Sequence, residues 1–229
     1  MLPDFPPDMT AAAARLALHG AGWREIGVGD WSWVFADPAD RLAARATPFD
    51  PAYRLHAEAC RAGPPNRYLP RIDAIHPLMR DGHVVVMERL WPAEEHAAAA
   101  LCAAVGIVND TGYAPPPGTI PHPDDTDLAD LRRRLRTLLA EGARRYRLWG
   151  GSDIRPGNML ADRNGGLKLV DPVFVKGKAI AEAIGAGDRA SLADFTRAQL
   201  EDFLTIPPFR PGPETDTLRA RLAGLYAAD

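Results

Sequence analysis

The feature that most constrains the fold is a change of apolar spacing near residue 90. Residues 23–90 show the alternation and turn signals of antiparallel strands, with one helical segment inserted. Trp31, Trp33 and Phe35 alternate along one such strand, and a turn at residues 37–40 leads to the next one. Beyond residue 90 the apolar residues recur mainly at helical spacing. This pattern predicts an α+β chain of two lobes, with a sheet-rich lobe at 1–90 and a mainly helical lobe at 91–229.

Local signals place the individual elements. Thr10 is a suitable N-cap for a helix over residues 10–19, and Pro51 suits the first turn of the inserted helix, residues 50–62. Two strands within residues 70–90 are joined around Asp81 and Gly82. A loop rich in Pro, Gly and Asp covers residues 109–125. We expect further helices over 93–105, 126–147, 188–204 and 214–227.

Composition excludes several classes of protein. The net charge of −3 gives no basic footprint of the kind that nucleic-acid binders carry. No run approaches the roughly 18 apolar residues of a membrane span, and the first residues lack a signal-peptide pattern. Cys60 and Cys102 fit two reduced thiols in helices, and the histidines have no metal-ligand spacing. We therefore expect a cytoplasmic protein with neither a nucleic-acid partner nor a membrane partner.

Residues 148–174, LWGGSDIRPGNMLADRNGGLKLVDPVF, place several polar side chains between two apolar runs. Phosphoryl transfer needs a carboxylate for the acceptor proton, a cation, and oxygen ligands for Mg²⁺. Asp153, Arg155, Asn158 and Asp171 supply that set. A hairpin turning at residues 164–166 would return Asp171 to the neighbourhood of Asn158. The alternative is a polar turn without chemistry, because Pro-Gly and Asn-Gly pairs form turns by themselves.

The segments GSDIRPGN and DPV resemble the catalytic loop and the metal-binding segment of the protein-kinase-like superfamily. The similarity is to its short bacterial members, which are related to aminoglycoside phosphotransferases, and it implies a two-lobe kinase-like fold. It also implies Asp153 as catalytic base, Arg155 as a cation near the phosphates, and Asn158 and Asp171 as Mg²⁺ ligands. One position departs from the family pattern, since Gly151 stands where the family has a loop histidine.

The segment GVGDWSWV, residues 27–34, fits the family's glycine-rich loop, with Gly27 and Gly29 at two glycine positions and Ser32 at the third. Small residues there allow a hairpin to lie across nucleotide phosphates. An ordinary tight turn is the alternative explanation. The strand VVVMERL would then lead to the hinge that binds adenine, through the carbonyl of Glu88 and the amide of Leu90.

Three further positions complete the nucleotide site that the resemblance implies. Met87 would line the back of the adenine pocket. Arg45 occupies the position of the family's third-strand lysine and would pair with Glu58. Arginine is longer and forked, so the exchange is not conservative at a packed site. Arg45 either grips the phosphates or marks weakened activity.

The resemblance implies an ATP- and Mg²⁺-dependent kinase that phosphorylates a hydroxyl of a small molecule or of a protein. Two alternatives stay open, namely a nucleotide-binding pseudokinase that serves as an interaction module, and a nucleotidyltransferase on the same fold. The sequence names neither the acceptor nor the oligomeric state, and it does not separate ATP from GTP.

Overall fold

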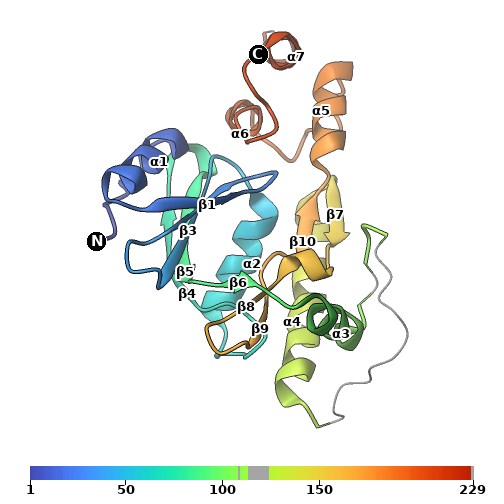
Figure 1. The fold of residues 1–229 in the computed structure, drawn as a ribbon. Coiled ribbons are helices and arrows are strands. Elements are labelled where there is room, and N and C mark those ends of the chain that lie inside the picture. The colour runs from blue at the N-terminus through green and yellow to red at the C-terminus, as the bar shows by residue number, and fades with distance from the viewer. Residues whose placement is uncertain (108, 113–123, 228–229) are drawn as a thin grey trace. The chain divides into compact units, whose positions relative to one another are not determined.

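The computed structural model describes residues 1–107, 109–112 and 124–227. It confirms an α+β chain whose N-terminal region is rich in sheet and whose C-terminal region is mainly helical (Figure 1). Two compact units divide the chain, and both are discontinuous in sequence. The first contains Met1–Asp50, Ala74–Val86 and Lys176–Asp229, and the second contains Pro51–Asp73 and Met87–Val175. This division differs from a single boundary near residue 90, and the assignment of two lobes stays a prediction.

A five-stranded sheet carries most of the N-terminal region. Its strand order is β1 (Arg24–Val28), β2 (Trp33–Ala36), β3 (Leu42–Thr47), β5 (His83–Glu88) and β4 (Ile72–Pro77). The strands β1, β2 and β3 pair antiparallel in chain order, as the two predicted turns require. Between β4 and β5 lies a short 3-10 turn, η1 (Met79–Asp81), so the predicted join around Asp81 is confirmed.

The first helix packs against strand residues of the first unit through its buried apolar side chains. Helix α1 (Ala11–Gly20) begins as predicted, because the Thr10 side chain accepts a hydrogen bond from the Ala13 amide. Its buried Leu18 packs in one apolar cluster with Trp23, Phe35 and Val84. This core therefore combines the N-terminal helix with residues of β2 and β5.

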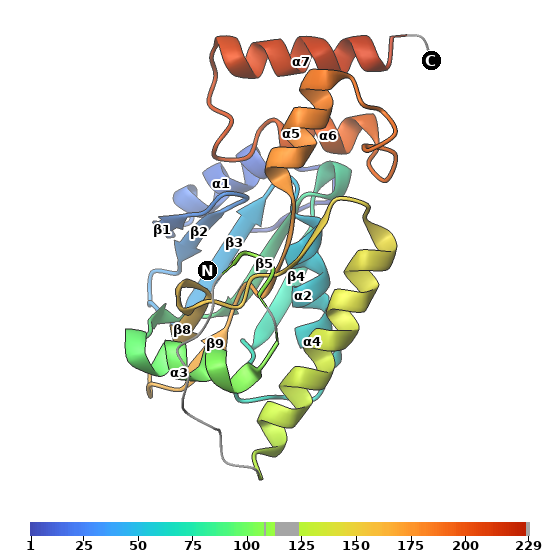
Figure 2. The same cartoon turned by 90° about the vertical axis from the view of Figure 1, so that its right-hand side faces the viewer.

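Three helices complete the first unit, α5 (Gly177–Ala186), α6 (Arg197–Phe203) and α7 (Pro213–Leu225) (Figure 2). The helix predicted over 188–204 is wrong for its first half. Gly187 ends α5 in the left-handed conformation, and Asp188 then forms a turn by accepting hydrogen bonds from the amide and hydroxyl of Ser191. Helix α6 starts only where Thr196 and Gln199 form a capping box.

The described residues of the second unit form three α-helices and two small sheets. Its helices are α2 (Pro51–Ala62), α3 (Glu95–Val105) and α4 (Thr126–Arg145). One sheet pairs β7 (Trp149–Ser152) with β10 (Val173–Val175), and the other has the order β6 (Trp91–Pro92), β8 (Met159–Ala161) and β9 (Leu167–Leu169). Leu131 and Leu135 of α4 pack with Met159 and Leu169, which fixes the β8–β9 hairpin on the helices.

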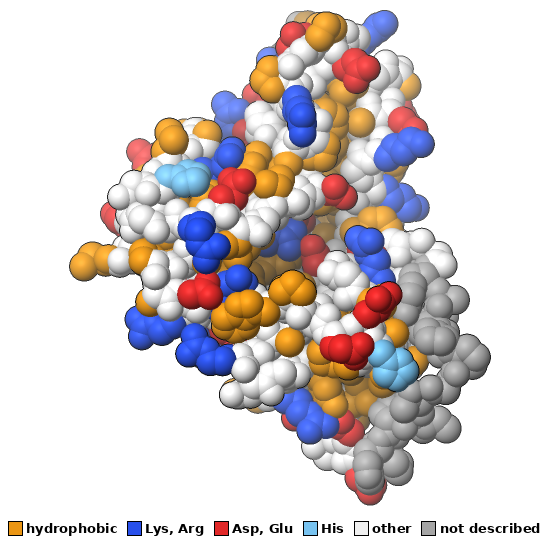
Figure 3. All heavy atoms as spheres, in the orientation of Figure 1, with side chains coloured by type: hydrophobic (Ala, Val, Ile, Leu, Met, Phe, Trp, Pro, Cys, Tyr) orange, Lys and Arg blue, Asp and Glu red, His pale blue; other side chains and the backbone are white. Residues whose placement is uncertain are grey.

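Acidic and basic side chains are interspersed on the face shown in Figure 3. Among the described residues, no helix has the length and apolar character needed to cross a membrane.

Candidate active site

The backbone of residues 152–172 forms one hydrogen-bonded frame. Asp153 follows β7, and its amide donates to the carbonyl of Pro172 at 2.7 Å. A short 3-10 turn, η2 (Pro156–Asn158), precedes β8, and the carbonyl of Asn158 accepts from the Val170 amide at 2.9 Å. These bonds join both ends of the loop to the backbone on either side of Asp171. The hairpin predicted to return the chain to Asn158 is therefore confirmed.

Within this frame the side chains of Asp153, Asn158 and Arg155 are in direct contact. The amide nitrogen of Asn158 donates to the Asp153 carbonyl at 2.7 Å and to Asp153 Oδ2 at 2.9 Å. Arg155 Nε lies 2.9 Å from the other carboxylate oxygen, Oδ1. The Asp153 side chain is 14% exposed and that of Arg155 is 53% exposed, so the carboxylate is held in place at a largely covered position.

The oxygen atoms of this loop suit a hard divalent cation. The side-chain nitrogen of Asn158 donates its hydrogen bonds to Asp153, so a metal would be bound through the side-chain oxygen of Asn158. Mg²⁺ prefers carboxylate and amide oxygens, and Asp171 supplies a half-buried carboxylate in the same frame. No group of three or more His, Cys, Asp or Glu side chains suited to a metal occurs in the described part of the chain. A cation here would take its ligands from Asn158, Asp171 and a substrate.

The glycine at position 151 has a structural reason. Its φ is +95°, and a Cβ built there would lie 2.2 Å from Oδ2 of Asp110. That oxygen accepts hydrogen bonds from the amide of Ser152 at 2.8 Å and from its hydroxyl at 3.1 Å. The carboxylate of Asp110 therefore fills the space that a side chain at 151 would need.

Sequence reasoning missed the residues that lie against this loop. Thr111 Oγ1 is 3.0 Å from Asp153 Oδ1, and Asn109 Nδ2 donates to the Ile154 carbonyl at 3.0 Å. We expected only a loop over 109–125, of which residues 113–123 lie outside the described residues. Asn-Asp-Thr-Gly is an ordinary turn sequence, and no local signal connects it with Asp153, 42 positions away.

The predicted hinge residues lie in the same unit as the loop that carries Asp153. Met87 is buried and accepts a long hydrogen bond of 3.8 Å from the Tyr53 hydroxyl to its sulfur. The Glu88 carboxylate accepts from the Arg71 amide at 2.8 Å and lies 3.8 Å from Lys168 Nζ. Leu90 is also buried. The pairing of Glu88 with Lys168 was not predicted. The binding of adenine by Met87, Glu88 and Leu90 stays a prediction.

The glycine segment folds as the predicted hairpin in the first unit. Gly29 donates its amide to the Ser32 carbonyl at 2.9 Å, which closes the turn between β1 and β2. A Cβ added at Gly27 would meet nothing within 4 Å, and at Gly29 it would meet only Ser32 Oγ at 3.9 Å. Neither glycine has a positive φ. The local fold therefore does not itself require glycine at these two positions.

Arg45 has a partner that the sequence did not indicate. Its guanidinium donates to the Asp50 carboxylate at 2.8 Å, and the two side chains are 11% and 5% exposed. Glu58, the expected partner, lies exposed on α2 and accepts from Arg54 at 2.9 Å. Arg45 and Glu58 belong to different units, so their pairing stays a prediction.

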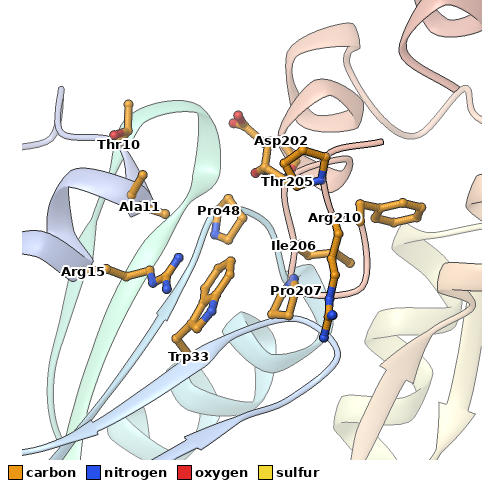
Figure 4. Close-up of a pocket in the computed structure, with 13 residues that line it drawn as sticks. Thr10, Ala11, Arg15, Trp33, Pro48, Asp202, Thr205, Ile206, Pro207 and Arg210 are labelled. Carbon is orange, nitrogen blue, oxygen red and sulfur yellow. Dashed lines mark hydrogen bonds between the residues drawn. The ribbon is translucent and has the colours of Figure 1, made fainter. Parts of the chain in front are cut away.

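A separate pocket of about 560 Å³ lies within the first unit (Figure 4). Arg15 of α1 stacks on the Trp33 ring of β2, with its guanidinium carbon 3.8 Å from the ring centroid. Ile206, Pro207 and Arg210 line the pocket from the segment after α6. None of the residues assigned to the candidate active site lines this pocket.

Comparison with known proteins adds little beyond this geometry. No protein-family profile matches the chain, and no curated protein sequence does. Among solved structures, the chain is similar to aminoglycoside phosphotransferase APH(3'')-Id from Streptomyces rimosus, with a TM-score of 0.36 and 17% sequence identity. The match covers 93% of this chain and 97% of that one.

Proposed function

We propose that the protein is an ATP- and Mg²⁺-dependent phosphotransferase that phosphorylates a hydroxyl of a small molecule or of a protein. The observation that carries the proposal is the double hydrogen bond from the Asn158 amide to the carbonyl and carboxylate of Asp153. The backbone bonds to Pro172 and Val170 then bring the segment of Asp171 to the same loop. In this proposal one general base and two oxygen ligands of different chemistry act together, as phosphoryl transfer requires.

Each residue of the loop has a distinct task in this proposal. Asp153 accepts the proton of the acceptor hydroxyl through the carboxylate that Asn158 orients. Arg155, which is half exposed, offers positive charge to the transferring phosphoryl group. Asn158 Oδ1 and Asp171 would hold Mg²⁺, which neutralises phosphate charge when bound.

The first unit supports the nucleotide part of the proposal. At positions 27 and 29, neither the backbone conformation nor contacts with the described residues require glycine. Glycine at such positions allows another molecule to approach the backbone closely, and phosphate bound by amide groups needs that approach. Ser32, which is buried, fills the third position of the hairpin.

Isothermal titration with a non-hydrolysable ATP analogue, with and without Mg²⁺, tests the nucleotide site. We expect Mg²⁺-dependent binding that the Asp171→Asn variant loses and that Gly157→Ala, in the same loop, retains. Asp153→Ala should bind the analogue but consume no ATP. ATP consumption that survives Asp153→Ala would contradict the assignment of the base.

One observation favours a second function, a nucleotide-binding pseudokinase. Arg45 stands at the family's lysine position, and Asp50 already neutralises its charge at 2.8 Å. This alternative predicts nucleotide binding without turnover against any acceptor, and no recovery of turnover in Arg45→Lys. Mass spectrometry of a modified acceptor separates both functions from nucleotidyl transfer, since an added AMP differs in mass from an added phosphate.

A further inference from the structure

We propose that Thr111 is an acceptor of the phosphoryl group, so that the protein phosphorylates its own chain at this residue. The inference rests on the proposed phosphotransferase function and names one acceptor for it. Its starting point is the distance of 3.0 Å between Thr111 Oγ1 and Asp153 Oδ1. General-base catalysis requires a separation of about 2.6–3.2 Å between the base and the atom that gives up its proton.

The hydroxyl has one proton and two acceptors within hydrogen-bond distance. Asn109 Oδ1 lies 2.7 Å from Thr111 Oγ1 and also accepts from the Thr111 amide at 3.0 Å. Asp153 Oδ1, at 3.0 Å, is the stronger base of the two because it belongs to a carboxylate, so it is the atom that takes the proton in the reaction. Both neighbours of the hydroxyl are acceptors, so its oxygen keeps its lone pairs for an electrophile. Thr111 is exposed, which leaves room for a phosphoryl group on its open side.

The segment that carries Thr111 is fastened to the catalytic loop at several points. The amide of Asp110 donates to the Ser152 carbonyl at 3.1 Å, and the Asp110 carboxylate accepts from the Ser152 amide. Asn109 Nδ2 binds the Ile154 carbonyl at 3.0 Å. Residues 109–111 therefore lie alongside residues 152–154, and the Thr111 hydroxyl adds one further contact between the two segments.

Gly151 connects this arrangement with the departure from the family pattern. A Cβ at position 151 would lie 2.2 Å from Asp110 Oδ2, so any side chain there would displace Asp110. The exchange of the family's loop histidine for glycine thus makes room for the segment that presents Thr111. A neighbouring hydroxyl is a poorer acceptor, because Ser152 is fully buried and its Oγ is 3.1 Å from Asp110 Oδ2.

The step conserves atoms and charge with a nucleoside triphosphate as co-reactant. A bond forms between Thr111 Oγ1 and the γ-phosphorus, and the bond from that phosphorus to the β,γ-bridging oxygen breaks. The bridging oxygen keeps the electron pair and leaves with the nucleoside diphosphate. The hydroxyl proton passes to the carboxylate of Asp153.

Two measurements on the purified full chain test the proposal. In the first, protein is incubated with ATP and Mg²⁺, phosphorylation sites are mapped by mass spectrometry, and ADP release is followed in parallel. We expect one phosphate on Thr111, none on Thr137 of α4, and a first-order rate that does not change with protein concentration. Thr111→Ser, which keeps the hydroxyl, should retain the label, while Thr111→Ala and Asp153→Ala should lose it by at least about tenfold.

The second measurement needs no nucleotide. Amide hydrogen exchange over residues 109–112 should be severalfold faster in Thr111→Ala than in the wild type, and unchanged in Thr111→Ser. Equal exchange in all three proteins would overturn the placement of the hydroxyl. ADP release that depends on Asp153 without phosphate on Thr111 would overturn this inference and leave the phosphotransferase function standing. Absence of both ADP release and phosphorylation would overturn both.

Discussion

Replacing Gly151 by alanine should destabilise the second unit by about 2–5 kcal/mol. The residue has φ +95°, and a left-handed conformation costs an L-residue roughly 1–2 kcal/mol. The new Cβ would also lie 2.2 Å from Asp110 Oδ2 and force that carboxylate away. Asp110 accepts hydrogen bonds from the amide and hydroxyl of Ser152, which is fully buried, and an unsatisfied buried donor costs about 1–3 kcal/mol.

Urea unfolding followed by both circular dichroism and tryptophan fluorescence measures this cost and tests whether the transition is single. Gly157→Ala is the matched control, since its φ is not positive and its Cβ would meet nothing within 4 Å. We expect that control to change the unfolding free energy by less than about 0.5 kcal/mol. In an Asp110→Ala background the cost of Gly151→Ala should fall to the conformational part, about 1–2 kcal/mol. Equal effects of the two glycine variants, or no coupling to Asp110, would refute the reasoning.

Three further predictions follow from the ion pair of the first unit and from three groups whose pKa values are raised by burial. Asp50→Ala should cost about 3–5 kcal/mol in a urea titration because it leaves the buried Arg45 guanidinium without that carboxylate, whereas the exposed Glu58→Ala should cost less than about 0.5 kcal/mol. Burial raises the pKa of Asp202 from 3.8 to about 6, so the folded state binds this proton more tightly and its contribution to stability is lost as pH rises through about 6. The melting temperature of the wild type should therefore fall relative to Asp202→Asn between pH 4 and pH 7, and parallel melting curves across that range would contradict the assignment. Burial also raises the pKa of Cys60 to about 12 and that of Cys102 to about 11, so both thiols should react with a disulfide reagent at pH 8 only after unfolding.

Much of the fold follows from interactions between residues close in sequence. The turn after β2 forms because the Asp37 carboxylate accepts from the amide of Leu42 at 2.7 Å, and α1 begins where Thr10 caps it. The β8–β9 hairpin likewise turns where Asp162 Oδ1 accepts from the amides of Asn164 and Gly166. Side chains such as these accept hydrogen bonds from backbone amides only a few positions away. Turns and helix starts of this kind can therefore be predicted from the sequence. The same locality explains the error at 188–204, where one glycine and one Asp turn override helical apolar spacing.

The sequence by itself indicated the antiparallel strands within residues 23–90, several of the helices and the polar loop at residues 153–158, since these depend on spacing within a few positions. Only the tertiary structure decided which side chains surround that loop. Thr111 and Asp110 reach Asp153 and Ser152 across 42 positions, and Asp50 rather than Glu58 lies against Arg45 in the first unit. These side-chain pairs depend on how separate elements pack against one another. Apolar periodicity predicts only which face of an element is buried, and it does not predict which residue of another element lies opposite. A buried polar group takes whichever partner the packed neighbours bring within hydrogen-bond distance.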